Sequence, residues 1–135
     1  MNDTPVRVAV LGMGWWSDVL SDAIKRSSEM EIVACFTRSE DKRQAFAQKY
    51  GCRAAASYEE ILADGSIAAI INTTPNNVHL ETTRQAAQAG KHVFLDKPIA
   101  NTVPDPKVPP AVIEQFSKNN AAIVDILKGM AAGKK

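Results

Sequence analysis

The 135-residue sequence predicts an α/β protein built on a doubly wound parallel sheet. Short apolar runs rich in β-branched residues alternate with segments of helical periodicity, which is typical of strand–helix–strand units. Two glycines, Gly12 and Gly14, separate the first apolar run from the first helical segment. The predicted strand at 67–74 opens with the uninterrupted apolar run 67–71, as expected of a central strand covered on both faces. In such a sheet, ligands bind at the carboxyl ends of the strands.

The first half of the chain contains clear start and stop signals for its elements. The first helix is predicted from apolar residues at helical spacing, namely Val19, Leu20, Ala23 and Ile24. Ser39 is expected to cap the second helix, and Gly51 is expected to end it. The predicted elements are strands at 6–11 and 31–37, a helix from about 16 to 28, and a short strand near 52–56.

The second half continues the same alternation. Ser57 and Glu60 match a capping box, in which the serine accepts a backbone N–H and the glutamate reaches back to the cap. A further helix is expected to start at Asn76 and to end at Gly90. The remaining predicted strands are 67–74 and 91–98, the latter stopped by Pro98 because proline has no N–H for the ladder.

Composition excludes several classes of function. The formal charge is +1 and no basic stripe is visible, so we expect no nucleic-acid partner. No apolar run approaches the roughly 20 residues of a membrane span, and no cationic, apolar leader precedes the first strand. We therefore expect a cytoplasmic protein without a membrane partner. Cys35 and Cys52 form no CxxC pattern, and we predict no metal site.

The segment Gly12-Met13-Gly14-Trp15-Trp16-Ser17 is a G-x-G-x-x-S variant of the dinucleotide-binding motif. Gly12 would permit the tight turn, Gly14 the close approach of a pyrophosphate, and a small third residue the packing of helix on strand. The predicted fold is therefore of the Rossmann type. The tryptophans are expected either beside the cofactor or on a surface for another domain, with a core role for one of them as the alternative.

Thr37, Arg38 and Ser39 follow the second predicted strand, about 20 residues beyond the glycines. An NAD-preferring site places an acid there for the ribose hydroxyls, and this sequence has none. A guanidinium suits a 2′-phosphate. We therefore predict NADP as the preferred cofactor, with NAD as the alternative.

Two further clusters follow later strands. The predicted cofactor-binding residues in the first are Thr73, Thr74, Pro75, Asn76 and His79, where hydroxyls, a fixed turn and a helix N-terminus come together. For His79, a simple packing role is the alternative. The second cluster is Asp96 and Lys97, where we expect the following proline to hold the lysine in an extended conformation that can project its cation into the crevice.

With these residues assembled, the chain resembles the N-terminal half of the Gfo/Idh/MocA oxidoreductase family over residues 5 to about 103. The resemblance rests on "VAVLGMGWWSDVL" and "TPNNVHLETTRQAAQAGKHVFLDKPIA". It implies a nicotinamide-dependent oxidoreductase of sugars or polyols. It also implies that Lys97 is the catalytic lysine, which orients the substrate hydroxyl and assists proton transfer. Asp96 stands where the family usually has glutamate, so any contact made by that longer side chain is in question.

The predicted organisation is a dinucleotide-binding domain at 1–103, a proline-rich linker at 104–110 and a C-terminal tail at 111–135. For the tail we favour one amphipathic helix, with a helix and a sixth strand as the alternative. From the length that follows Val103, we expect no counterpart here of the second α+β domain that the resemblance implies. Three hypotheses follow: an oxidoreductase, a non-catalytic NADP-binding module or partner subunit, and a truncated gene product. Closure of the site by a paired copy of the chain would make a homo-oligomer.

Overall fold

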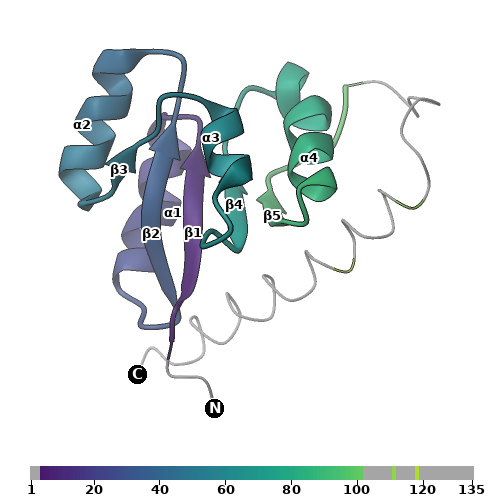
Figure 1. Ribbon diagram of the computed structural model, residues 1–135. Helices are drawn as coiled ribbons and strands as arrows, with labels where there is room; N and C mark the ends of the chain where they lie inside the picture. Colours follow the sequence, from purple (N-terminus) through teal and green to yellow (C-terminus); the bar gives the residue numbers. More distant parts are fainter. Residues whose placement is uncertain (1–3, 102–110, 112–117, 119–135) are drawn as a thin grey trace.

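The computed structural model describes residues 4–101 together with positions 111 and 118. Within this part of the chain, a parallel sheet is flanked by helices on both faces (Figure 1). In chain order the elements are β1 (Val6–Leu11), α1 (Trp15–Lys25), β2 (Met30–Phe36), α2 (Glu40–Tyr50), β3 (Arg53–Ala54), α3 (Tyr58–Ala63), β4 (Ala69–Asn72), the 3-10 helix η1 (Asn76–Val78), α4 (His79–Gln88) and β5 (His92–Leu95).

The sheet has the strand order β3-β2-β1-β4-β5, and every neighbouring pair is parallel. The chain therefore moves outward from β1 to β3 and then crosses back to β4 on the other side of β1. This reversal is the topological switch point, at which doubly wound sheets bind their ligands. The predicted doubly wound, Rossmann-type fold is confirmed.

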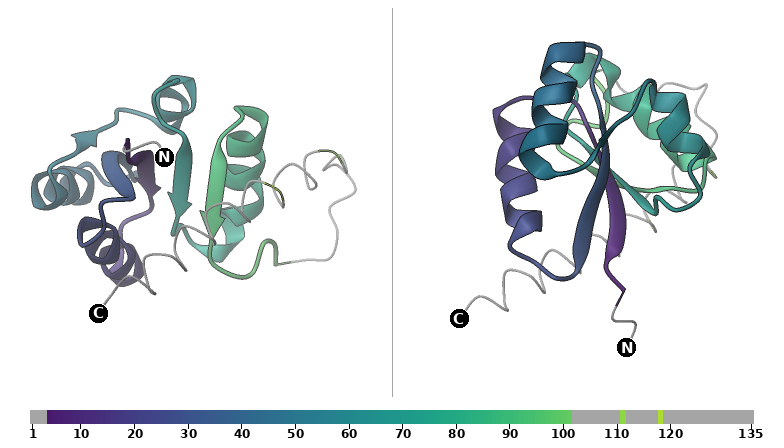
Figure 2. Two further views of the ribbon diagram at one scale, coloured as in Figure 1. Left: turned by 90° about the horizontal axis from the view of Figure 1, so that it is seen from below. Right: turned by 60° about the vertical axis from the view of Figure 1, so that its left-hand side comes forward.

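The residues of β1 alternate between two apolar cores, one on each face of the sheet. Val8 and Val10 pack with residues of α1 and α2. Ala9 and Leu11 pack with residues of α3 and α4. The views in Figure 2 show these two helix pairs on opposite sides of the strands. Residues 8–11 of this central strand are buried on both faces, which explains why this part of β1 is apolar at every position.

The buried face of α1 differs from the predicted one. Its buried residues are Ser17, Ser21 and Ile24, whereas Val19 is 36% exposed. Short side chains at 17 and 21 let the helix lie close to the strands behind the glycine turn, as this motif requires. Apolar spacing alone pointed to Val19 because it gives no weight to small polar residues at a close contact.

The predicted caps of α2 and α3 are confirmed with one difference in detail, whereas α1 ends at Lys25 rather than near 28 and α4 begins at His79, after the 3-10 helix. The Ser39 hydroxyl accepts the Lys42 N–H at 3.5 Å, and Gly51 ends α2 with a φ of 68°. At α3, the Ser57 hydroxyl accepts the Glu60 N–H at 3.1 Å. The Glu60 carboxylate accepts the N–H of Ala56 at 3.0 Å rather than that of the cap residue.

The last strand is shorter than predicted. β5 ends at Leu95, three residues before Pro98, so proline does not stop it. Beyond the strand, the Asp96 carboxylate accepts the N–H of Lys97 at 2.9 Å. The Lys97–Pro98 peptide bond is cis.

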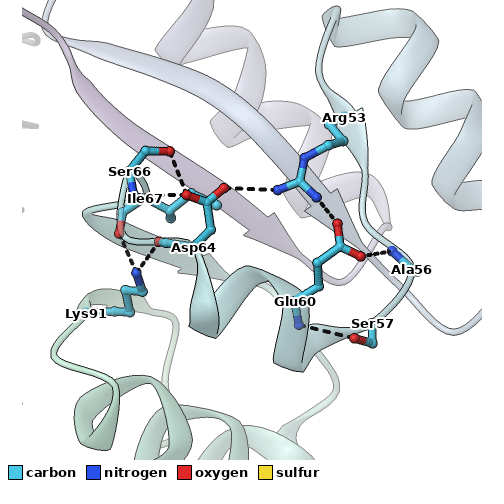
Figure 3. Close-up of polar contacts among 8 residues, drawn as sticks. All are labelled: Arg53, Ala56, Ser57, Glu60, Asp64, Ser66, Ile67 and Lys91. Carbon is cyan, nitrogen blue, oxygen red and sulfur yellow. Dashed lines mark hydrogen bonds and ion pairs between the residues drawn. The ribbon is translucent and has the colours of Figure 1, made fainter.

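At the amino ends of β3, β4 and β5, a polar cluster joins three segments (Figure 3). Arg53 forms ion pairs with Glu60 and with Asp64, the latter at 3.1 Å. The buried Lys91 ammonium donates to the carbonyl oxygens of Asp64 at 2.6 Å and Ile67 at 2.8 Å. These contacts fix the loop between α3 and β4 against the start of β5.

The predicted linker at 104–110 lies outside the described residues, as does the predicted tail at 111–135 apart from positions 111 and 118. Their assignments therefore stay predictions. Within the described part of the chain, no helix has the length and apolar character needed to cross a membrane. Cys35 and Cys52 are free thiols, the first buried and the second partly buried.

Candidate functional site

A cleft of ≈ 600 Å³ lies at the carboxyl ends of β1, β2 and β4. It brings together three segments that are far apart in the sequence: the glycine turn, the residues after β2 and the residues after β4. The predicted site residues that line it are Gly12, Met13, Gly14, Thr37, Arg38, Thr73, Thr74 and Pro75. The sequence analysis missed Leu11, Phe36, Lys42, Tyr58, Asn77, Val78 and Thr82, which also line it.

The two glycines of the turn are required for different reasons. Gly12 is buried and has a φ of 84°, which favours glycine. A Cβ built there would lie 2.8 Å from the backbone atoms of Thr73 and Thr74. Gly14 has an extended φ of −154°, and a Cβ there would meet no protein atom within 4 Å among the described residues. Gly12 is therefore needed by the fold, while Gly14 leaves space for a ligand.

The N-terminus of α1 presents backbone donors beside this space. The Ser17 hydroxyl closes the turn, because it accepts the Gly14 N–H at 2.9 Å and donates to the Gly14 carbonyl at 2.7 Å. The N–H groups of Met13, Trp15 and Trp16 make no hydrogen bond to any described residue. Unpaired first-turn amides and the positive end of the helix dipole together suit an anion.

The tryptophans of the motif are at the surface. Trp15 is 76% exposed and Trp16 is 37% exposed, with their ring centroids 5.8 Å apart. The alternative of a core role is therefore wrong for both. Neither side chain lines the cleft, so their predicted contact with a cofactor stays a prediction.

The residues after β2 include two arginines in contrasting settings. Arg43 lies 5.5 Å from the centroid of the Phe36 ring and donates to the Thr37 carbonyl at 3.0 Å, so it supports the loop. Arg38 is exposed, lines the cleft, and has no hydrogen bond or ion pair to the described residues. Ser39 lies outside the lining and caps α2. The guanidinium of Arg38 is thus available to a ligand.

Lys42 is a second cation of the cleft that the sequence analysis missed. It lies in the first turn of α2, where the helix dipole disfavours a positive side chain. A lysine at that position next to Thr37 and Arg38 is the sequence signal that would have identified it. The lining contains no aspartate or glutamate, so the described cleft is positively charged and suits phosphate.

The hydroxyls after β4 shape the cleft as well as line it. Thr73 donates to the carbonyl oxygens of Leu11 at 3.0 Å and Gly12 at 2.9 Å, which ties this segment to the glycine turn. Thr74 donates to the Asn72 side-chain oxygen at 2.7 Å. Both hydroxyls keep oxygen lone pairs that can accept from a ligand.

Thr74 is connected through Asn72 to a buried polar network. The Asn72 amide donates to the Thr82 hydroxyl at 2.8 Å, so its oxygen faces Thr74. Tyr58 donates to the Thr82 carbonyl at 2.6 Å, and burial raises the pKa of its hydroxyl. The network orients the segment after β4, and it involves residues of α3, β4 and α4 that only the fold brings together.

The remaining predicted residues do not line the cleft. Asn76 is exposed and begins η1. His79 is 2% exposed, and its ring nitrogens face two backbone carbonyls. Asp96 and Lys97 are exposed and follow β5, whose carboxyl end lies beside that of β4. Lys97 is therefore on the same edge of the sheet as the cleft.

Comparisons with known proteins agree with this geometry. Residues 6–118 match the model of an oxidoreductase family with an NAD-binding Rossmann fold, known as Gfo/Idh/MocA. A dTDP-3,4-didehydro-2,6-dideoxy-alpha-D-glucose 3-reductase of Saccharopolyspora spinosa is 34% identical over 103 residues, which are 75% of this chain and 31% of that protein. D-xylose 1-dehydrogenase (NADP(+)) 2 of Haloferax volcanii is 39% identical over 75 residues, or 55% of this chain and 23% of that protein.

Among solved structures, biliverdin reductase of Synechocystis, in complex with biliverdin and NADP+, has a TM-score of 0.75 and 27% identity. The match covers 86% of this chain and 36% of that one. The chain spans 22–31% of the length of the curated relatives that it matches first. The predicted resemblance is confirmed: the chain belongs to the Gfo/Idh/MocA oxidoreductase family, whose NAD(P)-binding Rossmann domain it forms.

Proposed function

We propose that the chain binds NADP(H) in this cleft and prefers it to NAD(H). The observation that carries the preference is the charge of the lining, which has the cations of Arg38 and Lys42 and no carboxylate among the described residues. The guanidinium after β2 and the ammonium in the first turn of α2 would hold the 2′-phosphate of the adenosine ribose. An NAD-preferring site would need an acid at that position to accept from the ribose hydroxyls.

The residues present fit the rest of the dinucleotide. The pyrophosphate would lie against Gly14, where the space beyond its Cα is open, and would accept from the unpaired amides of Met13, Trp15 and Trp16. The nicotinamide end would reach toward Thr74 and Pro75, which line the cleft after β4. When bound, the nicotinamide ring supplies or accepts a hydride.

We assign the catalytic role to Lys97. Its ammonium would orient a substrate hydroxyl and exchange a proton with it, which hydride transfer to or from that carbon requires. His79, the other candidate base, is engaged at both ring nitrogens by backbone carbonyls. By analogy with the relatives, the substrate would be a sugar or polyol. A protein that binds NADP(H) without turnover, as a module or partner subunit, is the second candidate, because both ring nitrogens of His79 already face backbone carbonyls.

The test of the binding proposal is a titration of NADPH and NADH against Arg38→Ala and the unchanged chain. A hydrogen bond to a charged group is worth about 1.5–3 kcal/mol, so NADPH affinity should fall roughly 10- to 150-fold. NADH affinity should change little. The matched control is Arg26→Ala, which removes an exposed arginine at the far end of α1. Equal losses for both cofactors would refute the assignment of Arg38.

Lys97→Ala separates catalysis from binding. We expect NADPH affinity to be retained and NADP-dependent turnover of sugars or polyols to be lost. Binding without turnover by the unchanged chain, over a broad panel of sugars and polyols, would favour the second candidate. Failure to bind either dinucleotide by calorimetry would exclude both.

A further inference from the structure

Asn72 is a buried side-chain amide in contact with two residues that line the cleft. It is the last residue of β4 and is 1% exposed. Its side-chain oxygen lies 3.2 Å from the backbone nitrogen of Thr74 and 2.7 Å from the Thr74 hydroxyl oxygen. Its amide nitrogen lies 2.8 Å from the hydroxyl oxygen of Thr82, on α4. The amide therefore links the segment after β4 to a helix.

The backbone of Thr74 defines the orientation of this amide. A backbone N–H only donates, so the Asn72 atom that faces it is the side-chain oxygen. That oxygen carries no hydrogen, so the Thr74 hydroxyl, at 2.7 Å, donates to it. A hydroxyl has one hydrogen, and the hydrogen of Thr74 is thereby directed at Asn72. Thr74 is left with only oxygen lone pairs to offer a ligand in the cleft.

The other side of the amide agrees with this orientation. The Asn72 nitrogen donates to the Thr82 hydroxyl, which in turn donates to the carbonyl oxygen of Val78 at 2.8 Å. Each hydrogen along this series of contacts then meets an acceptor. The reverse orientation of the amide would instead place two N–H groups against each other at 3.2 Å. The series therefore has one consistent direction, from Thr74 and Thr82 outward.

Thr73 is in the same condition as Thr74. Its hydroxyl faces the carbonyl oxygens of Leu11 at 3.0 Å and Gly12 at 2.9 Å, and both can only accept. By contrast, the first-turn amides of α1 and the cations of Arg38 and Lys42 offer hydrogens. The cleft thus presents donors around the glycine turn and after β2, and hydroxyl acceptors after β4.

We propose that the Thr74 hydroxyl, with its hydrogen held by Asn72, binds an uncharged hydrogen-bond donor of the dinucleotide. This donor is a ribose hydroxyl or the carboxamide N–H of the nicotinamide. Ionised phosphate and carboxylate oxygens only accept, so they are disfavoured at this position. Asn72 acts through Thr74 and is a positioning residue. The inference rests on the proposed NADP(H) binding, whereas the direction of the Thr74 hydrogen is a property of the chain without a ligand.

The first test needs no ligand. In the unchanged chain, nuclear Overhauser contacts should connect the side-chain amide hydrogens of Asn72 with the side chain of Thr82 and not with that of Thr74. Asn72→Asp identifies the signals, because it removes these hydrogens. Contacts to Thr74 in place of Thr82 would overturn the proposal, whether or not the chain binds NADP+.

The second test is the affinity for NADP+ of Thr74→Val and of its matched control, Thr74→Ser. Valine keeps the branched shape of threonine and removes the acceptor, while serine keeps the hydroxyl. Loss of one uncharged hydrogen bond should weaken binding by valine roughly 3- to 10-fold, and the serine variant should stay within about twofold of the unchanged chain. Unchanged affinity in Thr74→Val, or an equal loss in Thr74→Ser, would refute the proposal.

Nicotinic acid adenine dinucleotide phosphate, in which a carboxylate replaces the carboxamide, identifies the donor. If the carboxamide is the donor, this analogue should bind the unchanged chain at least about fivefold more weakly than NADP+, and Thr74→Val should not weaken it further. If a ribose hydroxyl is the donor, Thr74→Val should weaken both ligands by the same factor. Absence of NADP+ binding by the unchanged chain would refute the proposed function and leave the first test intact.

The role of Asn72 is tested by a double-mutant cycle. In Asn72→Ala the Thr74 hydrogen is no longer held, so Thr74→Val should cost less than about twofold in this background. Asn72→Asp keeps an acceptor for the Thr74 hydroxyl and should preserve the full cost of the valine substitution. A purely structural Asn72 would give the same cost of Thr74→Val in all three backgrounds, and that result would exclude positioning by Asn72.

Discussion

The two ends of the sheet use the same kinds of side chain in opposite ways. At the amino end, Arg53 is paired with two carboxylates and Lys91 donates to two carbonyls (Figure 3). At the carboxyl end, the described contacts leave Arg38 and Lys42 without an ion pair, and three backbone amides without an acceptor. The first set stabilises the fold, and the second is left for a ligand.

The difference shows how to separate structural from functional residues in this domain. A buried or paired polar group lowers the free energy of the folded state, because its partners would be unsatisfied without it. An unpaired cation on a positively charged surface gives no such stabilisation and becomes favourable only when an anion binds. Substitutions at the amino end should therefore change stability alone, and those at the carboxyl end should change binding, with Gly12 as an exception.

Gly12→Ala should have the largest effect and should affect both properties. The left-handed φ costs about 1–2 kcal/mol for alanine, and the clash with the Thr73 backbone adds about 1–3 kcal/mol. We expect the free energy of unfolding, measured with urea, to fall by about 2–5 kcal/mol, and NADPH binding to be lost. Gly65→Ala is the control, because its Cβ would meet no described atom within 4 Å. Equal stability of the two variants would contradict this account of the turn.

Lys91→Met should destabilise the protein without altering the site. The ammonium is buried, which lowers its pKa, and it satisfies two carbonyl oxygens that methionine cannot serve. We expect a loss of about 2–4 kcal/mol in the free energy of unfolding. NADPH affinity should stay within about twofold when measured under folding conditions. Lys25→Met, at an exposed position in the last turn of α1, is the control. Loss of NADPH affinity without loss of stability would show that the amino end of the sheet also contributes to binding.

Gly14→Ala should weaken binding while it preserves the fold. The extended φ suits alanine, and the methyl group meets no described protein atom. We therefore expect a change of less than about 1 kcal/mol in stability. The same methyl would occupy the space proposed for the pyrophosphate, and NADPH affinity should fall at least about tenfold, or 1.4 kcal/mol. Unchanged affinity by calorimetry would mean that the dinucleotide does not approach this glycine.

Asp64→Asn should change the stability toward urea least, and mainly in its dependence on pH. Hydrogen bonds from the Ser66 hydroxyl and N–H, with Arg53 nearby, hold the pKa of Asp64 below its ordinary value. A carboxyl whose pKa is lowered on folding stabilises the protein at pH values above the pKa of its unfolded state. This stabilisation is lost as the pH falls through the pKa of the folded state. The urea midpoint of the variant should therefore decline less steeply than that of the unchanged chain below about pH 4. Parallel curves would exclude this contribution.

Local signals predicted much of the fold. Ser39, Ser57 and Gly51 bound their helices as expected, because capping and left-handed termination involve only nearby residues. The end of β5 was placed wrongly: the strand ends at Leu95, three residues before the proline that was expected to stop it. The buried face of α1 was also predicted only in part, since a close helix–strand contact selects for small size as well as for apolar character.

The candidate site was predictable where a residue lies directly after a strand. Gly12, Arg38 and Thr74 each follow a strand of the same parallel sheet, so topology alone places them on one edge. Tyr58 and Thr82 were missed because their contribution depends on the packing of α3 against α4. Lys42 carried a local signal, a cation at the wrong end of a helix, that sequence analysis did not use.

The sequence by itself determined the doubly wound class, the glycine turn and the pair of loops that follow β2 and β4, because periodicity and turn chemistry are local properties. Tertiary structure alone decided that Gly12 is required by the Thr73 backbone, that both tryptophans are exposed, and that His79 lies between two carbonyls. These outcomes depend on distances between segments remote in sequence. Such distances follow from how the helices pack on the sheet, which no local pattern encodes.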